Sequence, residues 1–313
     1  MNKVTNTALT DDIKAKADSK LDEAGKALLS HKEILAHIFK ACVPEFKDVP
    51  YLELVNGNAM GKPELSKVIS ENTEGATSHG KRIHYDLKIR AITPIKEVAE
   101  LIINIEAQKS VNKKYPLLKR AGFYCATMLS EQKGTEFMRT DYGNIKKVYS
   151  IWVCTRTPKK RWNTIKEYHT VEKDVVGKGS KEKESNYDLS RIVMIYLGEE
   201  GSGTGLLRLL ETLFVSSKQP KEKLEILKNE FEIKVTEKIK EDISEMCNIS
   251  AGIREDALLK GRVEGRIEGR VEERVKSITS LMENAGWTLE QAMKMLGISE
   301  EEQSMYKEKL INY

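Results

Sequence analysis

Two short segments of the sequence carry side chains that could bind a divalent metal ion. Asp86 lies in 83–91, where apolar and polar residues alternate, and this alternation predicts a half-buried strand. Glu106 and Gln108 end the segment 101–108, whose apolar run predicts a more buried strand. Residues two apart on a strand share a face, so Glu106 and Gln108 are expected on one side. If the two strands pair, Asp86 and Glu106 can converge at one end of a sheet.

Two converging carboxylates favour a hard divalent cation, because oxygen ligands suit Mg²⁺ or Mn²⁺. Such an ion can polarise a phosphodiester and lower the pKa of an attacking water. The alternative is that Asp86 is a solvated strand residue and Glu106 simply ends its strand. On the pattern alone both interpretations stay open, since any carboxylate followed two residues later by a polar residue fits it.

The order of these residues resembles the PD-(D/E)XK nuclease superfamily. The likeness rests on Asp86, on Glu106-Ala107-Gln108 and on a Lys/Arg-rich helix expected directly after them. Within the superfamily the chain is most similar to the recombination-promoting nuclease or transposase family, which has Gln where most members have the motif Lys. The resemblance covers most of 30–215. Further stretches that fit are 71–74, 105–108, 134–137 and 147–152.

The resemblance implies a restriction-endonuclease-like α/β fold, with a mixed sheet flanked by helices. It also implies a metal-dependent DNA endonuclease that hydrolyses phosphodiester bonds and is associated with recombination or mobile elements. Asp86 and Glu106 would hold Mg²⁺ or Mn²⁺, with the Ala107 carbonyl as a further ligand. Gln108 would orient water or the phosphate.

With Gln108 in place of the motif Lys, the predicted site lacks one positive charge. Gln108 cannot supply the positive charge that the motif Lys gives to the developing phosphorane. Lys109 alternates to the opposite face of its strand unless the strand has ended. Lys88, two residues from Asp86, shares the Asp86 face and is the candidate substitute.

Two predicted helices offer further candidates for the site. Ser30 and Glu33 have the spacing of a capping box, opening a helix that runs to about residue 42. In the superfamily the first core helix often lends a carboxylate, so Glu33 is either a cap, which we favour, or a further acid. A second helix is predicted at 112–131. Its basic first half is either a solvated face or a phosphate-binding face, and the candidate DNA contacts on it are Lys113, Lys114 and Arg120.

Other strands are predicted at 51–55, 147–154, 164–176 and 191–197. The glycine-rich segment 198–205 lacks the Lys-Ser/Thr that a phosphate-binding P-loop needs, so we expect no nucleotide cofactor. These elements define three parts of the chain. They are a polar N-terminal arm (1–29), a nuclease-like core (30–215) and a helical C-terminal extension (216–313).

The extension contains a Gly-Arg-x-Glu repeat of period four at 261–272. On a helix this repeat forms a narrow apolar stripe, composed of Val263, Ile267, Val271 and Val275. Packing against a second copy would bury the stripe, so we expect a homo-oligomer. The alternative is a frayed, solvated tail.

The last segment, 287–299, resembles the first half of a helix-turn-helix with Gly297 at the turn. The next helix would begin with Glu300 and two further glutamates, which repel phosphate. A small helical cap or a partner-binding hairpin is therefore the favoured interpretation.

Bulk properties limit the class of protein. The chain has 313 residues, 32% of them charged, and a formal net charge of only +4, which permits DNA binding without arguing for it. Its four cysteines lack zinc-site spacing, and no apolar run is long enough to span a bilayer. We expect buried thiols in a reducing cytoplasm. Besides the endonuclease, two hypotheses remain: an inactive DNA-binding or oligomeric scaffold that retains the fold, and a protein-binding module carried by the tail.

Overall fold

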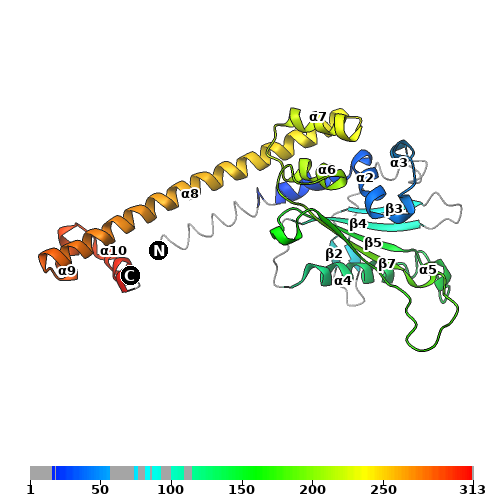
Figure 1. The fold of residues 1–313 in the computed structure, drawn as a ribbon, viewed down its shortest axis with the longest axis horizontal. Helices are drawn as coiled ribbons and strands as arrows, with labels where there is room; N and C mark the ends of the chain where they lie inside the picture. The colour runs from blue at the N-terminus through cyan, green and yellow to red at the C-terminus, as the bar shows by residue number, and fades with distance from the viewer. Residues whose placement is uncertain are drawn as a thin grey trace. The chain divides into compact units, whose positions relative to one another are not determined.

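The computed structural model (Figure 1) describes residues 16–17, 19–56, 74–76, 82–84, 87–92, 100–108 and 115–311. In 74–76, 82–84 and 100–108, and at positions 88, 90, 92 and 311, only the backbone is described. The chain divides into two compact units, 1–249 and 250–313.

A five-stranded mixed sheet forms the centre of the first unit, with the strand order β3-β4-β5-β7-β6. The strands are β3 (Leu87–Ile92), β4 (Glu100–Gln108), β5 (Val148–Cys154), β6 (Thr164–Tyr168) and β7 (Ser190–Tyr196). β4, β5 and β7 are parallel, whereas β3 is antiparallel to β4 and β6 is antiparallel to β7. The predicted α/β class with a mixed sheet is confirmed.

Helices cover both faces of this sheet (Figure 1). α4 (Leu117–Ser130) lies on one face, where Leu117, Ala121 and Tyr124 pack against Trp152 and Met194. We call this side the α4 face. The opposite face is covered by α2 (Lys32–Cys42) and α6 (Gly205–Phe214), and α7 (Pro220–Phe231) packs against α6; all three contribute to the larger core cluster.

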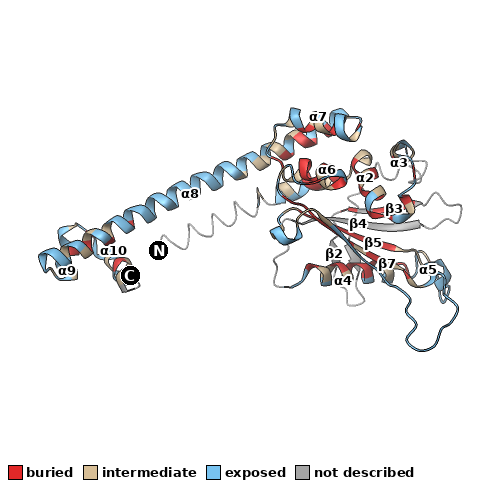
Figure 2. Cartoon of the chain, viewed as in Figure 1, coloured by how far each residue is buried: buried red, intermediate tan, exposed pale blue. Residues whose placement is uncertain are grey.

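β5 is buried along its whole length because both of its faces are covered (Figure 2). Tyr149, Ile151 and Val153 belong to the larger core, while Val148 and Trp152 belong to the α4 face. The apolar sequence of β5 therefore serves two cores at once, as expected of a central strand in a parallel region. β5 and β7 confirm the strands predicted at 147–154 and 191–197.

Other predicted strands differ from the structure. Residues 51–55 belong to a helix, α3 (Tyr51–Asn56), in which the amides of Glu53 and Leu54 donate to the Pro50 carbonyl. The strand predicted at 164–176 ends at Tyr168 as β6. β6 is an edge strand whose residues are mostly exposed, so its side-chain alternation does not report a buried face.

The strand predicted at 83–91 is divided between two sheets. β2 (Arg82–His84) pairs with β1 (Glu74–Ala76) in a separate two-stranded sheet, and β3 starts at Leu87. Asp86 lies outside the described residues. From Leu87 onward the apolar positions of the predicted alternation are confirmed as buried, because Leu87, Ile89 and Ala91 all belong to the larger core.

The predicted capping box at the start of α2 is wrong. α2 begins at Lys32, and its N-cap residue is His31. Ser30 instead ends the preceding helical segment, where its hydroxyl donates to the Ala27 carbonyl over 2.7 Å. A helix that continues to residue 29 leaves Ser30 at a C-terminal position rather than at an N-cap.

The larger core extends beyond the predicted range of 30–215 at both ends. Leu28 and Leu29 are buried within it, although they fall in the segment predicted as a polar arm. Leu227 and Ile239 are buried in it from the other end. The last of these lies in α8 (Glu237–Ala285), the long helix in which the boundary between the two units falls.

The second unit is a small helical cluster. The end of α8 packs with α9 (Leu289–Met295) and α10 (Glu300–Ile311) through a core of Val271, Val275, Ile278, Ala292, Met293, Ile298 and Tyr306. Gly297 makes the turn between α9 and α10 with a φ of 65°, as predicted, and α10 starts at Glu300. In the part of the chain that is described, no helix combines the length and apolarity needed to cross a membrane.

Candidate functional site

The structure describes only some of the predicted site residues. Asp86, Lys113 and Lys114 lie outside the described residues. Lys88 lies on β3 and Glu106, Ala107 and Gln108 on β4, where the backbone alone is described. Arg120 and Glu33 are described in full.

The register of β3 and β4 relates the two predicted metal ligands. Leu87 is the Cα partner of Ile105, and Lys88 is the partner of Asn104. In the sequence, Asp86 immediately precedes Leu87, and Glu106 immediately follows Ile105. In an antiparallel pair the next residues outward from Leu87 and Ile105 are Asp86 and Glu106.

The register also relates the β4 positions to a face of the sheet. Glu106 is paired with Trp152, and Gln108 with Cys154. Trp152 and Cys154 are buried in the cluster on the α4 face. Since directly paired residues occupy the same face of a sheet, Glu106 and Gln108 hold positions in the rows that belong to the α4 face.

Arg120 lies on the α4 face beside these positions. Its guanidinium carbon is 5.2 Å from the ring centroid of Trp152, the register partner of Glu106. The same guanidinium donates from Nε to the Tyr124 hydroxyl over 3.0 Å. The Tyr124 and Trp152 rings are in contact, with centroids 5.5 Å apart. The structure thus brings Arg120 next to the β4 motif, while Tyr124 is a core residue.

Glu33 is not brought to the same place. It lies on α2, which packs on the face of the sheet opposite to α4. Its carbonyl accepts a hydrogen bond from the Tyr51 hydroxyl over 3.4 Å. Glu33 therefore sits across the sheet from Arg120.

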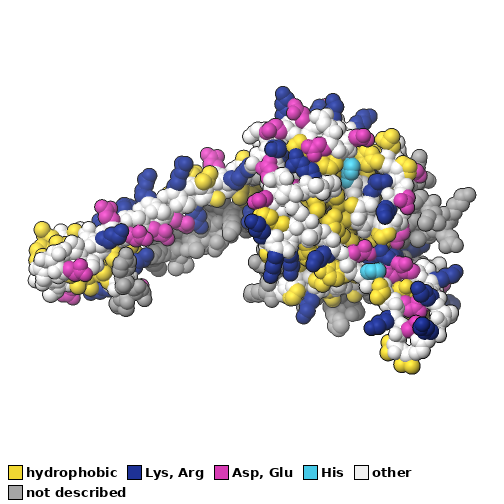
Figure 3. All heavy atoms as spheres, viewed as in Figure 1, with side chains coloured by type: hydrophobic (Ala, Val, Ile, Leu, Met, Phe, Trp, Pro, Cys, Tyr) yellow, Lys and Arg dark blue, Asp and Glu magenta, His cyan; other side chains and the backbone are white. Residues whose placement is uncertain are grey.

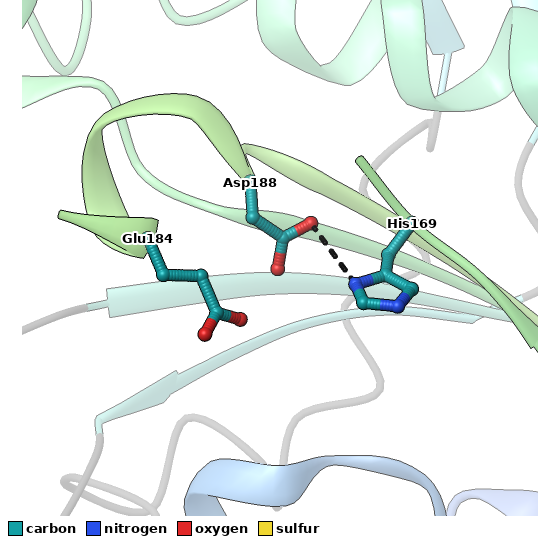
Figure 4. A group of neighbouring side chains, drawn as sticks. All are labelled: His169, Glu184 and Asp188. Carbon is teal, nitrogen blue, oxygen red and sulfur yellow. Dashed lines mark ion pairs between the residues drawn. The ribbon is translucent and has the colours of Figure 1, made fainter. Parts of the chain in front are cut away.

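A second group of possible metal ligands was not predicted from the sequence. His169, Glu184 and Asp188 each offer a ligand atom, and these atoms lie within 4.8 Å of one another (Figure 4). His169 Nδ1 is 3.9 Å from Asp188 Oδ1. The three residues come from the connection between β6 and β7, which includes α5 (Glu184–Tyr187). No regular spacing relates them, so a motif search could not have found them.

Cations already occupy much of this second group. Asp188 is buried, and its Oδ2 accepts from Lys147 Nζ and from Arg191 Nε, each over 2.6 Å. Arg191 also pairs with Glu184, and with Glu167 over 2.7 Å. A metal ion there would have to compete with the Arg191 guanidinium for two of its three ligands.

The pKa of Asp188 also reflects its pairing with Lys147 and Arg191. Burial by itself raises the pKa of this carboxyl, but hydrogen bonds from Lys147 and Arg191 outweigh it and hold the pKa below its usual value. Asp188 Oδ1 is buried and has no hydrogen-bond partner within the described part of the chain. These ion pairs link the β6–β7 connection to Lys147, the residue before β5. Asp188 Oδ1 takes no hydrogen bond in them.

The four cysteines follow the prediction of buried thiols in three cases. Cys42, Cys125 and Cys154 are buried, and burial raises the pKa of each to about 12. Cys247 is half-buried. All four are free thiols.

The chain was compared with protein-family models, with curated proteins and with solved structures, and none of the three comparisons found a match.

Proposed function

We propose that the protein is a metal-dependent DNA endonuclease that hydrolyses phosphodiester bonds, with its site on the α4 face at the ends of β3 and β4. The observation that carries the proposal is the register of these strands. Leu87 and Ile105 are partners, and the two predicted ligands are their immediate neighbours, Asp86 and Glu106. Two acidic residues 20 positions apart in sequence thus flank one pair of a ladder.

Continuing the ladder by one residue would pair Asp86 with Glu106 directly. Side chains of such a pair occupy one face, with Cβ atoms about 4.5–5.5 Å apart. That separation lets two carboxylates share one ion, and an all-oxygen ligand set suits Mg²⁺ or Mn²⁺. When bound, the ion would polarise the phosphodiester and lower the pKa of the attacking water.

The remaining residues have roles that follow from their positions and from the family resemblance. The resemblance makes the Ala107 carbonyl a further ligand and lets the Gln108 amide orient water or the phosphate. Lys88 is the partner of Asn104, which is two residues from Glu106, so it falls in the same alternating row. Lys88 would supply the positive charge that Gln108 lacks.

Arg120 fits the part of a phosphate-binding residue. Its guanidinium is held against Trp152 and Tyr124, one strand away from the Glu106 position. An arginine fixed by aromatic contacts loses less side-chain freedom when it binds a phosphate than a fully mobile one would. DNA is the substrate class that this arrangement and the resemblance favour.

The order of elements supports the finer description of the fold as restriction-endonuclease-like. The hairpin of β3 and β4 is followed by α4, which covers the sheet face beside the motif, and then by β5 parallel to β4. α4 begins at Leu117 rather than at the predicted residue 112, so of the candidate DNA contacts it carries only Arg120, on the face proposed for the two acidic residues.

The exposed part of the Gly-Arg-x-Glu repeat supports a homo-oligomer. Val271 and Val275 are buried inside the second unit, so only half of the predicted stripe is available. Leu259, Val263 and Ile267 remain exposed at spacings of four residues (Figure 2). Within the described chain, a Cβ added to Gly261, Gly265 or Gly269 would meet no atom within 4 Å, so a second helix could approach closely. We propose a second copy of the chain as the occupant.

A plasmid-nicking assay tests the proposed activity. Purified protein is incubated with supercoiled plasmid in Mg²⁺, in Mn²⁺ and in EDTA. Nicked or linear product in either metal, and none in EDTA, is the expected result. DNA binding without cleavage under all three conditions would instead favour the alternative, an inactive scaffold that retains the fold, which the uncharged Gln108 makes a specific possibility.

A further inference from the structure

The turn that follows β5 carries an unusual group of cations. Within 156–161 the exposed residues include Arg156, Lys159, Lys160 and Arg161, and we call these four residues the basic turn. No acidic residue occurs between Cys154 and Lys166. Figure 3 shows Lys and Arg side chains gathered over the part of the surface where Figure 1 draws this turn.

The basic turn leaves the sheet at the edge where the β4 motif ends. Cys154, the last residue of β5, is paired with Gln108 of β4 on one side and with Tyr196 of β7 on the other. These strands are parallel, so their C-terminal ends meet at one edge. The chain that leaves Cys154 therefore begins level with Gln108, one strand away.

Aromatic contacts place one cation of the turn over the α4-face row of the sheet. The Arg161 guanidinium carbon is 5.3 Å from the ring centroid of Tyr196, the β7 residue in the same row as Gln108 and Cys154. Arg120 occupies the equivalent position over Trp152, one strand closer to the β4 motif. Neighbouring strands are about 4.8 Å apart, so Tyr196 is about 10 Å across the sheet from Gln108.

The turn has a defined shape. Thr157 donates from its hydroxyl to the Leu197 carbonyl over 2.8 Å, and the Trp162 indole donates to the Thr157 carbonyl over 2.9 Å. Lys159 lies over the Trp162 ring, with Nζ 5.6 Å from its centroid. The charged ends of Lys159 and Arg161 thus lie near aromatic rings, while both residues remain exposed.

Among the described residues, no acidic side chain pairs with the basic turn. Within the described part of the chain, none of its four residues forms an ion pair, whereas Lys147, Arg191 and Lys218 all do. A local group of cations without acids is the electrostatic signature of a phosphate-binding surface. It matters more here because the net charge of the whole chain is only +4.

We propose that the basic turn binds the backbone phosphates of duplex DNA, extending the path of the DNA from the β4 motif across Arg120 to Arg161. This inference rests on the proposed function, because it assumes that the substrate at the motif is DNA. About 10 Å corresponds to roughly three base-pair steps along a strand, at 3.4 Å per step. Phosphate contacts position a duplex without reading its sequence, so the turn contributes affinity and register rather than base preference.

The test is a binding measurement in EDTA, where no cleavage occurs. Fluorescence anisotropy of a labelled duplex follows binding to the full chain over a range of salt concentrations. The variant replaces Arg156, Lys159, Lys160 and Arg161 with Gln. The matched control removes the same charge from another exposed loop by replacing Lys173, Lys178, Lys181 and Lys183 with Gln, where acidic residues are interspersed.

We expect the basic-turn variant to lose at least tenfold in affinity at low salt. The slope of log K against log salt should fall in magnitude by about 0.9 for each phosphate contact removed. The control should bind like the wild type. A double variant, Lys159→Gln with Lys160→Gln, leaves the Arg161–Tyr196 contact intact and should show a smaller loss in the same direction, so a folding defect does not decide the outcome.

Unchanged affinity and slope in the basic-turn variants would overturn the inference, as would an equal loss in the control. The proposed activity is judged separately. If the wild type cleaves DNA in Mg²⁺ but the variants bind normally, the basic turn is not the contact surface and the nuclease proposal stands. If the variants lose binding but the wild type never cleaves, the surface is right and the nuclease proposal falls.

Discussion

At the scale of single residues, the proposed chemistry depends on which residue supplies positive charge beside Asp86 and Glu106. Gln108 can orient a group but cannot neutralise a developing negative charge. The alternating row that contains Glu106 and Asn104 also contains Lys88 through the β3–β4 register. Lys88 is therefore the lysine of β3 that the backbone offers to the site.

Replacing Lys88 tests this assignment. Lys88→Ala should lower the rate of Mg²⁺-dependent cleavage by about a hundredfold, the usual effect of removing one group that stabilises transition-state charge. Lys88→Arg, which keeps the charge, should retain more of the rate. Rates are measured by plasmid nicking under single-turnover conditions.

Lys109→Ala is the matched control, because strand parity puts position 109 on the other face if the strand continues. It should cleave at nearly the wild-type rate. Normal cleavage by Lys88→Ala together with loss in Lys109→Ala would show that the parity argument is wrong.

At the scale of elements, the sequence predicts a strand best when side chains on both of its faces are buried. The strand that became β5 was predicted from alternation, and β5 and β7 both carry apolar side chains that are buried in the two cores. α3 was mistaken for a strand because Tyr51–Val55 is too short for its periodicity to separate the two structures. Edge strand β6 was predicted too long because solvent, rather than a core, faces most of its side chains.

The sequence suggests some residues of the candidate sites and misses others. The acidic positions, Arg120 and the Lys88 row follow from alternation and helical spacing, so sequence could suggest them. The group of His169, Glu184 and Asp188 could not be predicted, because only the tertiary fold of the β6–β7 connection brings them together. The same holds for Arg161 over Tyr196, which are 35 residues apart.

The Asp188 network makes a prediction about stability. Asp188→Asn should lower the free energy of unfolding by about 3 kcal/mol, the lower part of the range for breaking a buried ion pair, since Arg191 keeps two other carboxylates. Glu184→Gln is the control. It removes another partner of Arg191, but Glu184 is 59% exposed and should cost less than about 1 kcal/mol. Urea unfolding followed by tryptophan fluorescence measures both.

The same network should respond to acid. The folded-state pKa of Asp188 is below its unfolded value of about 3.9, so its stabilising contribution is present above that pH and is lost as pH falls through the folded pKa. Wild-type stability should therefore drop more steeply than that of Asp188→Asn as pH is lowered from 5 to 3. Parallel curves for the two proteins would contradict this account of the network.

At the scale of the whole molecule, the two units have different architectures. The first unit contains the sheet and the proposed site, and the second contains a closed helical cluster. One copy of the proposed site would cut one strand, and a two-fold dimer is the commonest way to hold two sites together. Half of the predicted apolar stripe is used inside the second unit, which a sequence pattern cannot distinguish from an exposed seam.

Val263 and Ile267, the exposed half of the apolar stripe, should form the contact between two copies of the chain. Wild-type protein at micromolar concentration should have twice the chain mass by light scattering. Val263→Ser with Ile267→Ser removes apolar area from both copies at about 1.5–3 kcal/mol per buried side chain, so it should give a monomer. Lys260→Gln, which breaks only the exposed pair with Glu264, should remain a dimer. A monomeric wild type would rule the seam out.

The most direct test of the central claim compares the two groups of possible metal ligands in one cleavage assay. Supercoiled plasmid is incubated in Mg²⁺ with wild type, Asp86→Asn and His169→Ala, after circular dichroism has shown that all three are folded. The β3–β4 site predicts that Asp86→Asn abolishes nicking while His169→Ala retains it. Wild-type nicking by Asp86→Asn, with loss in His169→Ala, would contradict the proposed site and move the chemistry to the His169, Glu184 and Asp188 group.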